Sequence, residues 1–551
     1  MSKNNAPIPI LDETQALATA SLENLYRIFT VPEAPNTTLG AIDKEISDNL
    51  MGFLSNRIVA VEKSLDDIEA DFATAGVPEV PQFVSDYTDF VMEKLVAHSV
   101  HTAAPGFIGH MATPLPYFML PLSRIMLALN QNLVKIETSK AFTPLERQVL
   151  GMLHNMVYQQ SEGFYRDNLH NSGRALGSFC SGGTTANITA LWAARDSMLA
   201  PQGDFAGLAQ LGLPAALKHY GLDGLAIMVS ERGHYSLGKA ADVLGIGRKN
   251  VIAVPTDEFA RVDVAAMRQR CAELRSRNIG IMAIVGIAGG TETGSVDPLT
   301  DLAELAQEYD THFHVDAAWG GPTLMSETHK HKLKGIELAD SVTIDAHKQL
   351  YVPMGAGMVV FKNPAKLGAV EHHAEYILRD GSKDLGQYSI EGSRPGMAML
   401  VHAAMHIIGR QGYEIIIDQS VEKAQQFANM IAAHPEFELC AEPELNILNY
   451  RYVPAALQLE LESADRARTV QINKVLDRVT KRMQKLQRAA GKTFVSRTRF
   501  PQARYDRAAV SVFRVVLANP MTTMQTLTAV LQEQTELAKD ADIVGMIEKL
   551  G

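Results

Sequence analysis

Short apolar strands alternate with amphipathic helices over residues 106–400, and this pattern limits the fold more than any other feature of the chain. The apolar runs include residues 224–230 (GLAIMVS) and 279–287 (IGIMAIVGI). Stretches with apolar residues three and four positions apart separate them, for example 186–199 and 299–309. Such alternation is typical of a mostly parallel α/β sheet, which binds ligands beyond the carboxyl ends of its strands. We therefore expect functional side chains to follow the strand ends.

The first hundred residues differ from this region in pattern. Residues 1–105 show helical periodicity, for example over 42–63 and 83–98, but they contain few apolar residues for a core of their own. We therefore expect this segment to pack on something larger, and a partner subunit is the candidate.

The C-terminal part predicts a smaller α+β domain. Residues 401–551 begin with helical sequence and continue with an amphipathic helix at about 468–490 and a strand candidate at 510–517. A chain of 551 residues is expected to form two or three domains. The predicted division is a helical dimerisation segment (1–105), a large ligand-binding α/β domain (106–400) and this small domain.

Charge and composition exclude several classes of function. The net charge of −11 disfavours nucleic acid as a partner. A small anionic substrate is compatible with it, because arginines cluster near the C-terminus at Arg497, Arg499, Arg504, Arg507 and Arg514. The three cysteines are far apart, so neither a disulfide framework nor a zinc site is predicted, and we expect no bound metal. Without a secretory signal or an apolar stretch of ~20 residues, a cytoplasmic protein with no membrane partner is expected.

The strand at 341–344 is followed at once by Asp-Ala-His-Lys, which ends at Lys348. A lysine at such a strand end faces the ligand crevice. In a partly desolvated or cationic site, its amine loses a proton more readily and can form a Schiff base with a carbonyl compound. A surface lysine after a strand is the alternative interpretation.

Residues 313–319 (FHVDAAW) end a second strand in Asp316. A buried carboxylate at this position needs a cationic partner. A protonated pyridine nitrogen is one such partner, and keeping it protonated makes the ring an electron sink. The small residues Ala317 and Ala318 would let a flat ring approach. The alternative is an aspartate that caps a following helix.

Residues 178–187 (SFCSGGTTAN) place glycines and hydroxyl groups at the start of a helix. Backbone N–H groups, hydroxyls and the positive end of the helix dipole together favour phosphate. The candidates are Ser181, Gly182, Gly183 and Thr184. The spacing is not GxxxxGK[ST], which disfavours a nucleoside triphosphate. An ordinary capped helix is the alternative.

His234 follows another strand, within residues 230–236 (SERGHYS). Its ring could lie flat over an aromatic ring, although a histidine with only a structural role is the alternative. Phosphate loop, histidine, carboxylate and lysine thus come in this chain order, each after a strand.

This order of motifs resembles that of the group II pyridoxal-phosphate decarboxylases, which include glutamate, aromatic amino acid and histidine decarboxylases. The resemblance is carried by HVDAAWGG (314–321) followed by DAHK (345–348), and it extends into VFRVVLANPMTT (512–523). It implies the cofactor pyridoxal 5′-phosphate, the aspartate aminotransferase-like fold type I, and a homodimer with active sites between subunits. Within the family the chain is most similar to bacterial aspartate 1-decarboxylases, near relatives of glutamate decarboxylase.

The resemblance also assigns residues to the cofactor ring. Lys348 would carry the cofactor, and Asp316 would pair with the pyridine nitrogen. Ala318 would pack on the ring face opposite His234, and Thr291, in AGGTETG, would lie by the ring or its 3-hydroxyl group.

The cofactor phosphate would be held by the glycine-containing loop. By the resemblance, Gly183 and Thr184 would bind it, with Ser181 and Gly182 nearby. His347, which precedes the lysine, would contact phosphate or substrate.

Three residues are assigned to the substrate. Arg514 aligns with the arginine that binds the substrate α-carboxylate in glutamate decarboxylases. His110 follows Gly109 where those enzymes have an Asn-Gln pair, and it would contact a distal carboxylate or only fill space. Tyr388, in the loop 379–393, is the candidate acid that protonates Cα, although it could equally pack the loop.

The resemblance predicts α-decarboxylation of an acidic amino acid, most simply L-aspartate to β-alanine, a precursor of pantothenate and coenzyme A. Glutamate, giving γ-aminobutyrate, is the alternative, because one methylene changes binding by only ~1–3 kcal/mol. An aromatic substrate ranks third. An aminotransferase or a carbon–sulfur lyase shares the fold and would be recognised by the absence of CO2 release.

Overall fold

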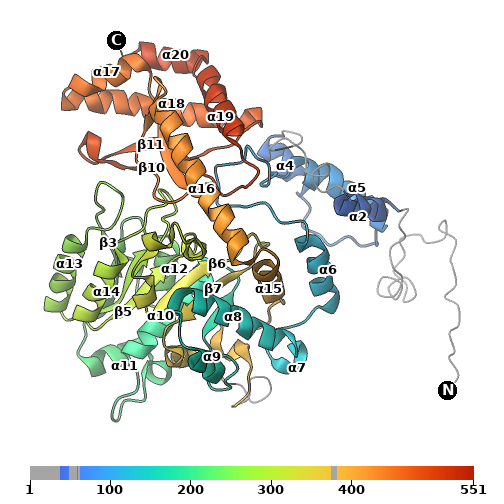
Figure 1. Cartoon of the computed structure of the whole chain (residues 1–551), viewed down its shortest axis with the longest axis vertical. Coiled ribbons are helices and arrows are strands. Elements are labelled where there is room, and N and C mark those ends of the chain that lie inside the picture. Colours follow the sequence, from blue (N-terminus) through green and yellow to red (C-terminus); the bar gives the residue numbers. More distant parts are fainter. Residues whose placement is uncertain (1–36, 49–58, 60–62, 374–380, 551) are drawn as a thin grey trace. The chain divides into compact units, whose positions relative to one another are not determined.

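The computed structural model describes residues 37–48, 59, 63–373 and 381–550 (Figure 1). The chain divides into two compact units, residues 1–104 with 489–493 and residues 105–488 with 494–551. The described elements of the first unit are α2 (Thr38–Asp48), α4 (Leu65–Asp71), α5 (Val84–Phe90), the π-helix η2 (Val91–Leu95) and the 3-10 helix η3 (Val96–His98). The helix expected over 42–63 is described only as far as Asp48, since most of its remainder lies outside the described residues.

The larger unit is built on a seven-stranded sheet with the order β1-β7-β6-β5-β4-β2-β3. The strands are β1 (Gly177–Cys180), β2 (Gly224–Ser230), β3 (Val251–Val254), β4 (Ile279–Ile287), β5 (His312–Asp316), β6 (Ser341–Asp345) and β7 (Gly357–Phe361). β3, β2, β4, β5 and β6 pair in parallel, and β7 runs antiparallel to both β1 and β6. The prediction of a mostly parallel sheet is therefore confirmed.

Helices cover both faces of this sheet, as the near-continuous apolar strands require. Side chains alternate along a strand, so Ala226 and Met228 of β2 enter one apolar cluster while Ile227 and Val229 enter another. The helices of this part are α6 (Met119–Leu129), α7 (Ile136–Ser139), α8 (Phe142–Tyr158), α9 (Glu162–Asn168), α10 (Gly183–Met198), α11 (Leu208–Tyr220), α12 (Ser236–Val243), α13 (Val264–Ser276), α14 (Leu299–Glu308) and α15 (Ala398–Ile407).

A second, antiparallel sheet with the order β10-β11-β9-β8 forms the C-terminal part of the same unit. Its strands are β8 (Phe437–Leu439), β9 (Ile447–Tyr452), β10 (Ser496–Gln502) and β11 (Ala508–Val516). The accompanying helices are α16 (Gly409–Ala432), α17 (Ala455–Ser463), α18 (Arg466–Ala490), α19 (Met524–Leu537) and α20 (Ala541–Glu548). The apolar stripe of α18 includes Ile472, Val475, Leu476 and Val479, three and four residues apart, which explains why the sequence predicted this helix.

Strand β10 was not expected from the sequence. It reads SRTRFPQ, and Arg497 and Arg499 on it are exposed. It lies at the edge of the sheet and pairs only with β11 among the described strands. An edge strand with polar outward residues lacks the apolar alternation that identifies a half-buried strand.

No helix within the described parts of the chain is long and apolar enough to cross a membrane.

Candidate active site

A cavity of about 360 Å³ opens at the carboxyl ends of the parallel strands, where the sequence predicted it. It lies beyond the ends of β1, β2, β4, β5 and β6, because each motif follows one of these strands. All ten residues predicted to bind the cofactor line it: Ser181, Gly182, Gly183, Thr184, His234, Thr291, Asp316, Ala318, His347 and Lys348. Three other predicted residues, Arg514, His110 and Tyr388, are not part of its lining.

The phosphate-loop candidate joins β1 to α10 with only two residues between them. The helix starts at Gly183 with no side chain capping it, so N–H groups of its first turn remain available to an anion. A carboxylate already sits on this loop, since the Ser181 backbone N–H donates to Glu391 Oε2 at 3.2 Å. A Cβ added at Gly183 would lie 2.8 Å from Asp345 Oδ2, so only glycine fits without a shift. This arrangement suits a phosphate group.

Lys348 follows β6 after two intervening residues, and its amine lies in the cavity. Its Nζ is 3.1 Å from Asp345 Oδ2. The Thr113 hydroxyl donates to the backbone oxygen of Lys348 at 2.8 Å, which helps to hold the turn. Asp345 is buried, and its Oδ1 has no hydrogen-bond partner among the described residues. The lysine is thus half-buried and presented by a rigid turn, as a covalent attachment point requires.

Asp316 is a buried carboxylate with only neutral partners in the described chain. Its Oδ2 accepts a hydrogen bond from Asn187 Nδ2 at 2.8 Å, and its Oδ1 accepts one from the Ala318 backbone N–H at 3.2 Å. Among the residues that the structure describes, it forms no ion pair. A buried charge is expected to have a cationic partner. A protonated ring nitrogen in the cavity would supply one, so the donor set fits pyridoxal phosphate.

A chain of neutral polar groups extends from Asp316 through Asn187 and His314 to Ser341. Asn187 Oδ1 lies 3.1 Å from His314 Nε2, and His314 Nδ1 lies 2.8 Å from Ser341 Oγ. Burial lowers the pKa of His314 to about 4, so this ring is uncharged near neutral pH. The negative charge of Asp316 is therefore left for a group in the cavity.

His234 lines the same cavity from the turn after β2. Its Nδ1 is 2.9 Å from Ser236 Oγ, which also accepts a hydrogen bond from Asn187 Nδ2 at 3.0 Å. Burial lowers the pKa of His234 below its usual value. An uncharged, oriented imidazole is suited to stacking on a flat ring.

His347 is oriented by its own neighbours. Its Nδ1 donates to the Ala356 carbonyl at 3.1 Å, because that oxygen can only accept, and its Nε2 lies 3.6 Å from Asp345 Oδ2. Burial lowers the pKa of His347 below its usual value. The Nε2 side of the ring is therefore turned toward the part of the cavity that Lys348 occupies.

The structure places Tyr388 elsewhere. It ends the 3-10 helix η9 (Leu385–Tyr388), is buried, and its hydroxyl donates to Glu371 Oε1 at 3.2 Å. Burial raises its pKa well above the usual range. This position does not support the prediction that Tyr388 protonates Cα within its own subunit, because the hydroxyl is committed to Glu371 outside the cavity lining.

Arg514 and His110 form a second region of substrate candidates, in which only Arg514 is charged at neutral pH. Arg514 is buried on β11, and its Nη1 donates to Gly109 O and to Ser496 Oγ, both at 3.3 Å. Its Nε has no hydrogen-bond partner in the described chain. Burial lowers the pKa of Arg514 to about 10, which leaves it charged at neutral pH. The pKa of His110 is lowered by partial burial and then by the positive charges of Arg514 and Lys348, so all three lie close together.

The other arginines of the C-terminal cluster do not join this region, contrary to the expectation of one local positive patch. Arg499 pairs with Asp477, Arg504 with Glu438, and Arg507 with Glu231. Arg497 is exposed. Arg514 lies opposite Ser496 in the ladder, on the other face of the sheet from Arg497 and Arg499, while Arg504 and Arg507 lie outside both strands. Arg514 is therefore the one buried cation of this cluster.

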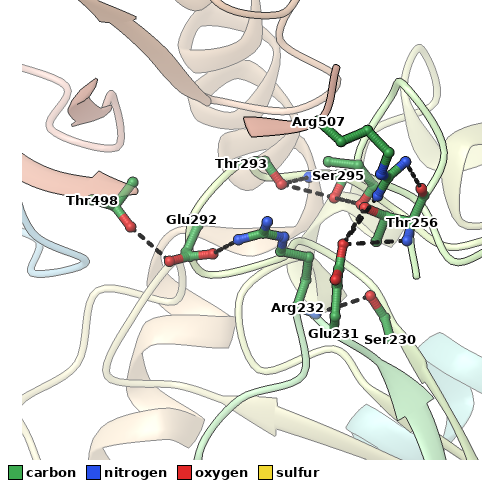
Figure 2. A network of polar contacts seen from close by, with 10 residues as sticks. Ser230, Glu231, Arg232, Thr256, Glu292, Thr293, Ser295, Thr498 and Arg507 are labelled. Atoms are coloured by element: carbon green, nitrogen blue, oxygen red, sulfur yellow. Dashed lines mark hydrogen bonds and ion pairs between the residues drawn. The ribbon is translucent and has the colours of Figure 1, made fainter. Parts of the chain in front are cut away.

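Sequence reasoning missed several residues that line the cavity, among them Asp345, Asn187 and Arg232. Asp345 and Asn187 stand inside motifs that were identified, but their contacts with Lys348 and Asp316 depend on the fold. Arg232 pairs with Glu292, with 2.5 Å between Nη1 and Oε2 (Figure 2). No local pattern signals a partner sixty positions away.

Within the described part of the chain, no group of three or more His, Cys, Asp or Glu residues could hold a metal ion.

Comparison with known proteins gives a consistent result. The sequence pattern of the pyridoxal-dependent decarboxylase conserved domain matches residues 71–453. The chain is 59% identical over 526 residues to an aspartate 1-decarboxylase of Aliivibrio fischeri, which covers 96% of both chains. It is 28% identical to an L-2,4-diaminobutyrate decarboxylase of Acinetobacter baumannii, over 67% of this chain and 71% of the relative.

Solved structures share the fold. The crystal structure of mouse CSAD superposes with a TM-score of 0.77 at 24% identity, covering 91% of this chain and 97% of that one. Tryptophan decarboxylase of Catharanthus roseus, in complex with L-tryptophan, gives a TM-score of 0.73 at 18% identity, covering 91% and 96%. Together with the cavity and its residues, these matches show that the chain belongs to the pyridoxal-dependent decarboxylase family and is a pyridoxal 5′-phosphate-dependent amino acid decarboxylase of fold type I.

Proposed function

We propose that this enzyme converts L-aspartate to β-alanine and CO2. The observation that carries the proposal is the 59% identity, over 96% of both chains, to a protein named aspartate 1-decarboxylase. Arg514 supplies a buried cation that can bind a carboxylate, and it contacts Gly109, the residue before His110. β-Alanine would then serve as a precursor of pantothenate and coenzyme A.

The residues of the cavity divide into those that hold the cofactor and those that set its charge. Lys348 would bind it covalently through Nζ, and the loop from Ser181 to Thr184 would hold the phosphate. Asp316 would pair with the ring nitrogen, while His234 and Ala318 would enclose the ring. When bound, pyridoxal phosphate supplies an electron sink for the electron pair left on Cα when CO2 departs.

The substrate would be oriented by one cation and one polar ring of this chain. Arg514 would bind the α-carboxylate and so fix the orientation of the Cα–carboxylate bond in the cavity. His110 would lie at the other end of an acidic substrate. We further propose a homodimer in which residues 1–105 pack on the partner, with the large domain at 106–400 and the small one at 401–551.

The direct test supplies the loaded enzyme with L-aspartate and L-glutamate separately and measures CO2 and the amine product by mass spectrometry. β-Alanine from aspartate, with little γ-aminobutyrate from glutamate, is the expected result. Predominant γ-aminobutyrate would make it a glutamate decarboxylase with the same site. A transaminated product without CO2 would contradict decarboxylation itself.

The phosphate loop predicts a selective loss of cofactor affinity in Gly183→Ala. The added Cβ would displace Asp345 and crowd the loop, so the dissociation constant for pyridoxal phosphate should rise about 10-fold, or ~1.4 kcal/mol. Equilibrium titration by fluorescence checks this. Gly238→Ala is the matched control, because its Cβ meets nothing within 4 Å. Equal affinities of the two variants for pyridoxal phosphate would show that the loop does not bind the phosphate.

Arg514→Gln should weaken substrate binding more than folding. A hydrogen bond to a charged partner is worth about 1.5–3 kcal/mol, so KM for aspartate should rise roughly 10- to 100-fold. Arg499→Gln, on the neighbouring strand and paired with Asp477, is the control and should leave KM unchanged. Steady-state kinetics of CO2 release measures both. An unchanged KM in Arg514→Gln would place the α-carboxylate elsewhere.

A further inference from the structure

Arg232 is a cation on the cavity wall for which the proposed function assigns no role. It follows β2, lines the cavity together with Lys348 and Asp316, and keeps its side chain only 11% exposed. Its Nη1 lies 2.5 Å from Glu292 Oε2, and Figure 2 shows the two side chains pointing toward each other. The turn after β2 is itself held by the Arg232 backbone N–H, which donates to Ser230 Oγ at 3.0 Å.

Glu292 is held from a second side. Thr498 on β10 donates its hydroxyl to Glu292 Oε1 at 2.6 Å (Figure 2). Glu292 also raises the pKa of Arg514, so the carboxylate lies within electrostatic reach of both arginines. The two arginines come from different elements, Arg514 from β11 and Arg232 from the turn after β2. Glu292 pairs with Arg232 and acts electrostatically on Arg514.

We propose that Arg232 is a specificity-determining residue that binds the side-chain carboxylate of the substrate, with Glu292 as the residue that positions it. The inference rests on the proposed function, in which Arg514 takes the α-carboxylate. A guanidinium carries five N–H donors in a planar fork, so Arg232 can contact Glu292 and a substrate carboxylate together. Its fixed charge also opposes the entry of amino acids with a cationic side chain.

The same residues contain a matched control. Arg507 also joins the small domain to the turn after β2: its Nη1 donates to Thr256 O at 2.6 Å and its Nη2 lies 3.2 Å from Glu231 Oε1 (Figure 2). Arg507 does not line the cavity of Lys348. If Arg232 only holds Glu292 in place for its contact with Thr498 of the small domain, Arg232→Gln and Arg507→Gln should behave alike.

The experiment compares cofactor-loaded wild type, Arg232→Gln, Arg232→Lys and Arg507→Gln. Initial rates of CO2 release are measured for L-aspartate, neutral L-2-aminobutyrate and cationic L-2,4-diaminobutyrate, and succinate binding is measured by calorimetry. Arg232→Gln is expected to lower the kcat/KM ratio of aspartate to 2-aminobutyrate about 10- to 100-fold, and to weaken succinate binding by a similar factor. Arg232→Gln also removes the cation that pairs with Glu292, so the rate with diaminobutyrate should rise relative to the rate with aspartate. Arg232→Lys should recover part of the ratio, and Arg507→Gln should keep it.

An unchanged ratio in Arg232→Gln, or equal shifts in Arg232→Gln and Arg507→Gln, would overturn the assignment. The substrate preference of the wild type distinguishes failure of the Arg232 assignment from failure of the proposed function. Should wild type prefer glutamate, the aspartate proposal fails, and Arg232 is judged by the same ratio measured with glutamate. Should wild type use neutral or cationic amino acids in preference to acidic ones, both proposals fall.

Discussion

Replacing Lys348 with alanine should abolish CO2 release, with a fall in kcat of at least about 10³-fold, as expected when the central reactive group of a site is removed. Lys348 is the only lysine that lines the cavity in the described chain, and its turn is anchored by the Thr113 hydroxyl. By the proposed function, this amine would attach the cofactor. No neighbouring side chain can take over, because Asp345 and His347 cannot form a Schiff base with an aldehyde.

This prediction is checked by product analysis together with the absorbance of the bound cofactor. Lys249→Ala, at an exposed position, is the control and should retain full activity. Because Lys348 also pairs with Asp345, the variant leaves that buried carboxylate without its cation, and thermal unfolding should be recorded for both. Full turnover by a folded Lys348→Ala protein would contradict the assignment of Lys348 as the residue that binds the cofactor.

Asp316→Asn should lower activity strongly and stability only modestly. In the loaded enzyme it would remove the anion that we propose to lie opposite the ring nitrogen. Breaking a buried ion pair costs about 3–5 kcal/mol, so kcat should fall roughly 10²- to 10³-fold. Without cofactor, Asp316 is a buried charge with neutral donors, Asn187 Nδ2 and the Ala318 N–H. The amide of Asn has only one oxygen, so its NH2 group would face one of these two N–H donors, and the cofactor-free protein should lose only about 1–3 kcal/mol of stability.

Rates of CO2 release and thermal unfolding with and without pyridoxal phosphate measure this divergence. Asp301→Asn, at an exposed position in α14, is the control and should change neither. Full turnover by a folded, cofactor-loaded Asp316→Asn protein would mean that Asp316 acts mainly in folding, through Asn187 and His314, rather than on the ring.

The parts of the fold that follow from local patterning were predictable. Strands β2 and β4 appear as apolar runs, because a strand buried on both faces has few polar side chains to interrupt it. Strand β10 was missed for the opposite reason, since its arginines point to solvent at the sheet edge.

The same distinction holds for the active site. Lys348, Asp316, His234 and the loop at Gly183 each follow a strand, so knowing the strands was enough to bring them to one edge of the sheet. The sequence by itself thus determined that the residues predicted to bind the cofactor share one location, because parallel strands align their carboxyl ends whatever their order.

Only the tertiary structure decided which groups meet across that edge. It brought Asn187 to Asp316, Glu292 to Arg232 and Asp345 to Lys348, and it directed Tyr388 to Glu371 instead of the cavity. It also separated Arg514 from the other C-terminal arginines, which pair with distant carboxylates. The physical reason is that side-chain contacts depend on strand order and on the packing of two sheets, and neither leaves a periodic signal along the chain.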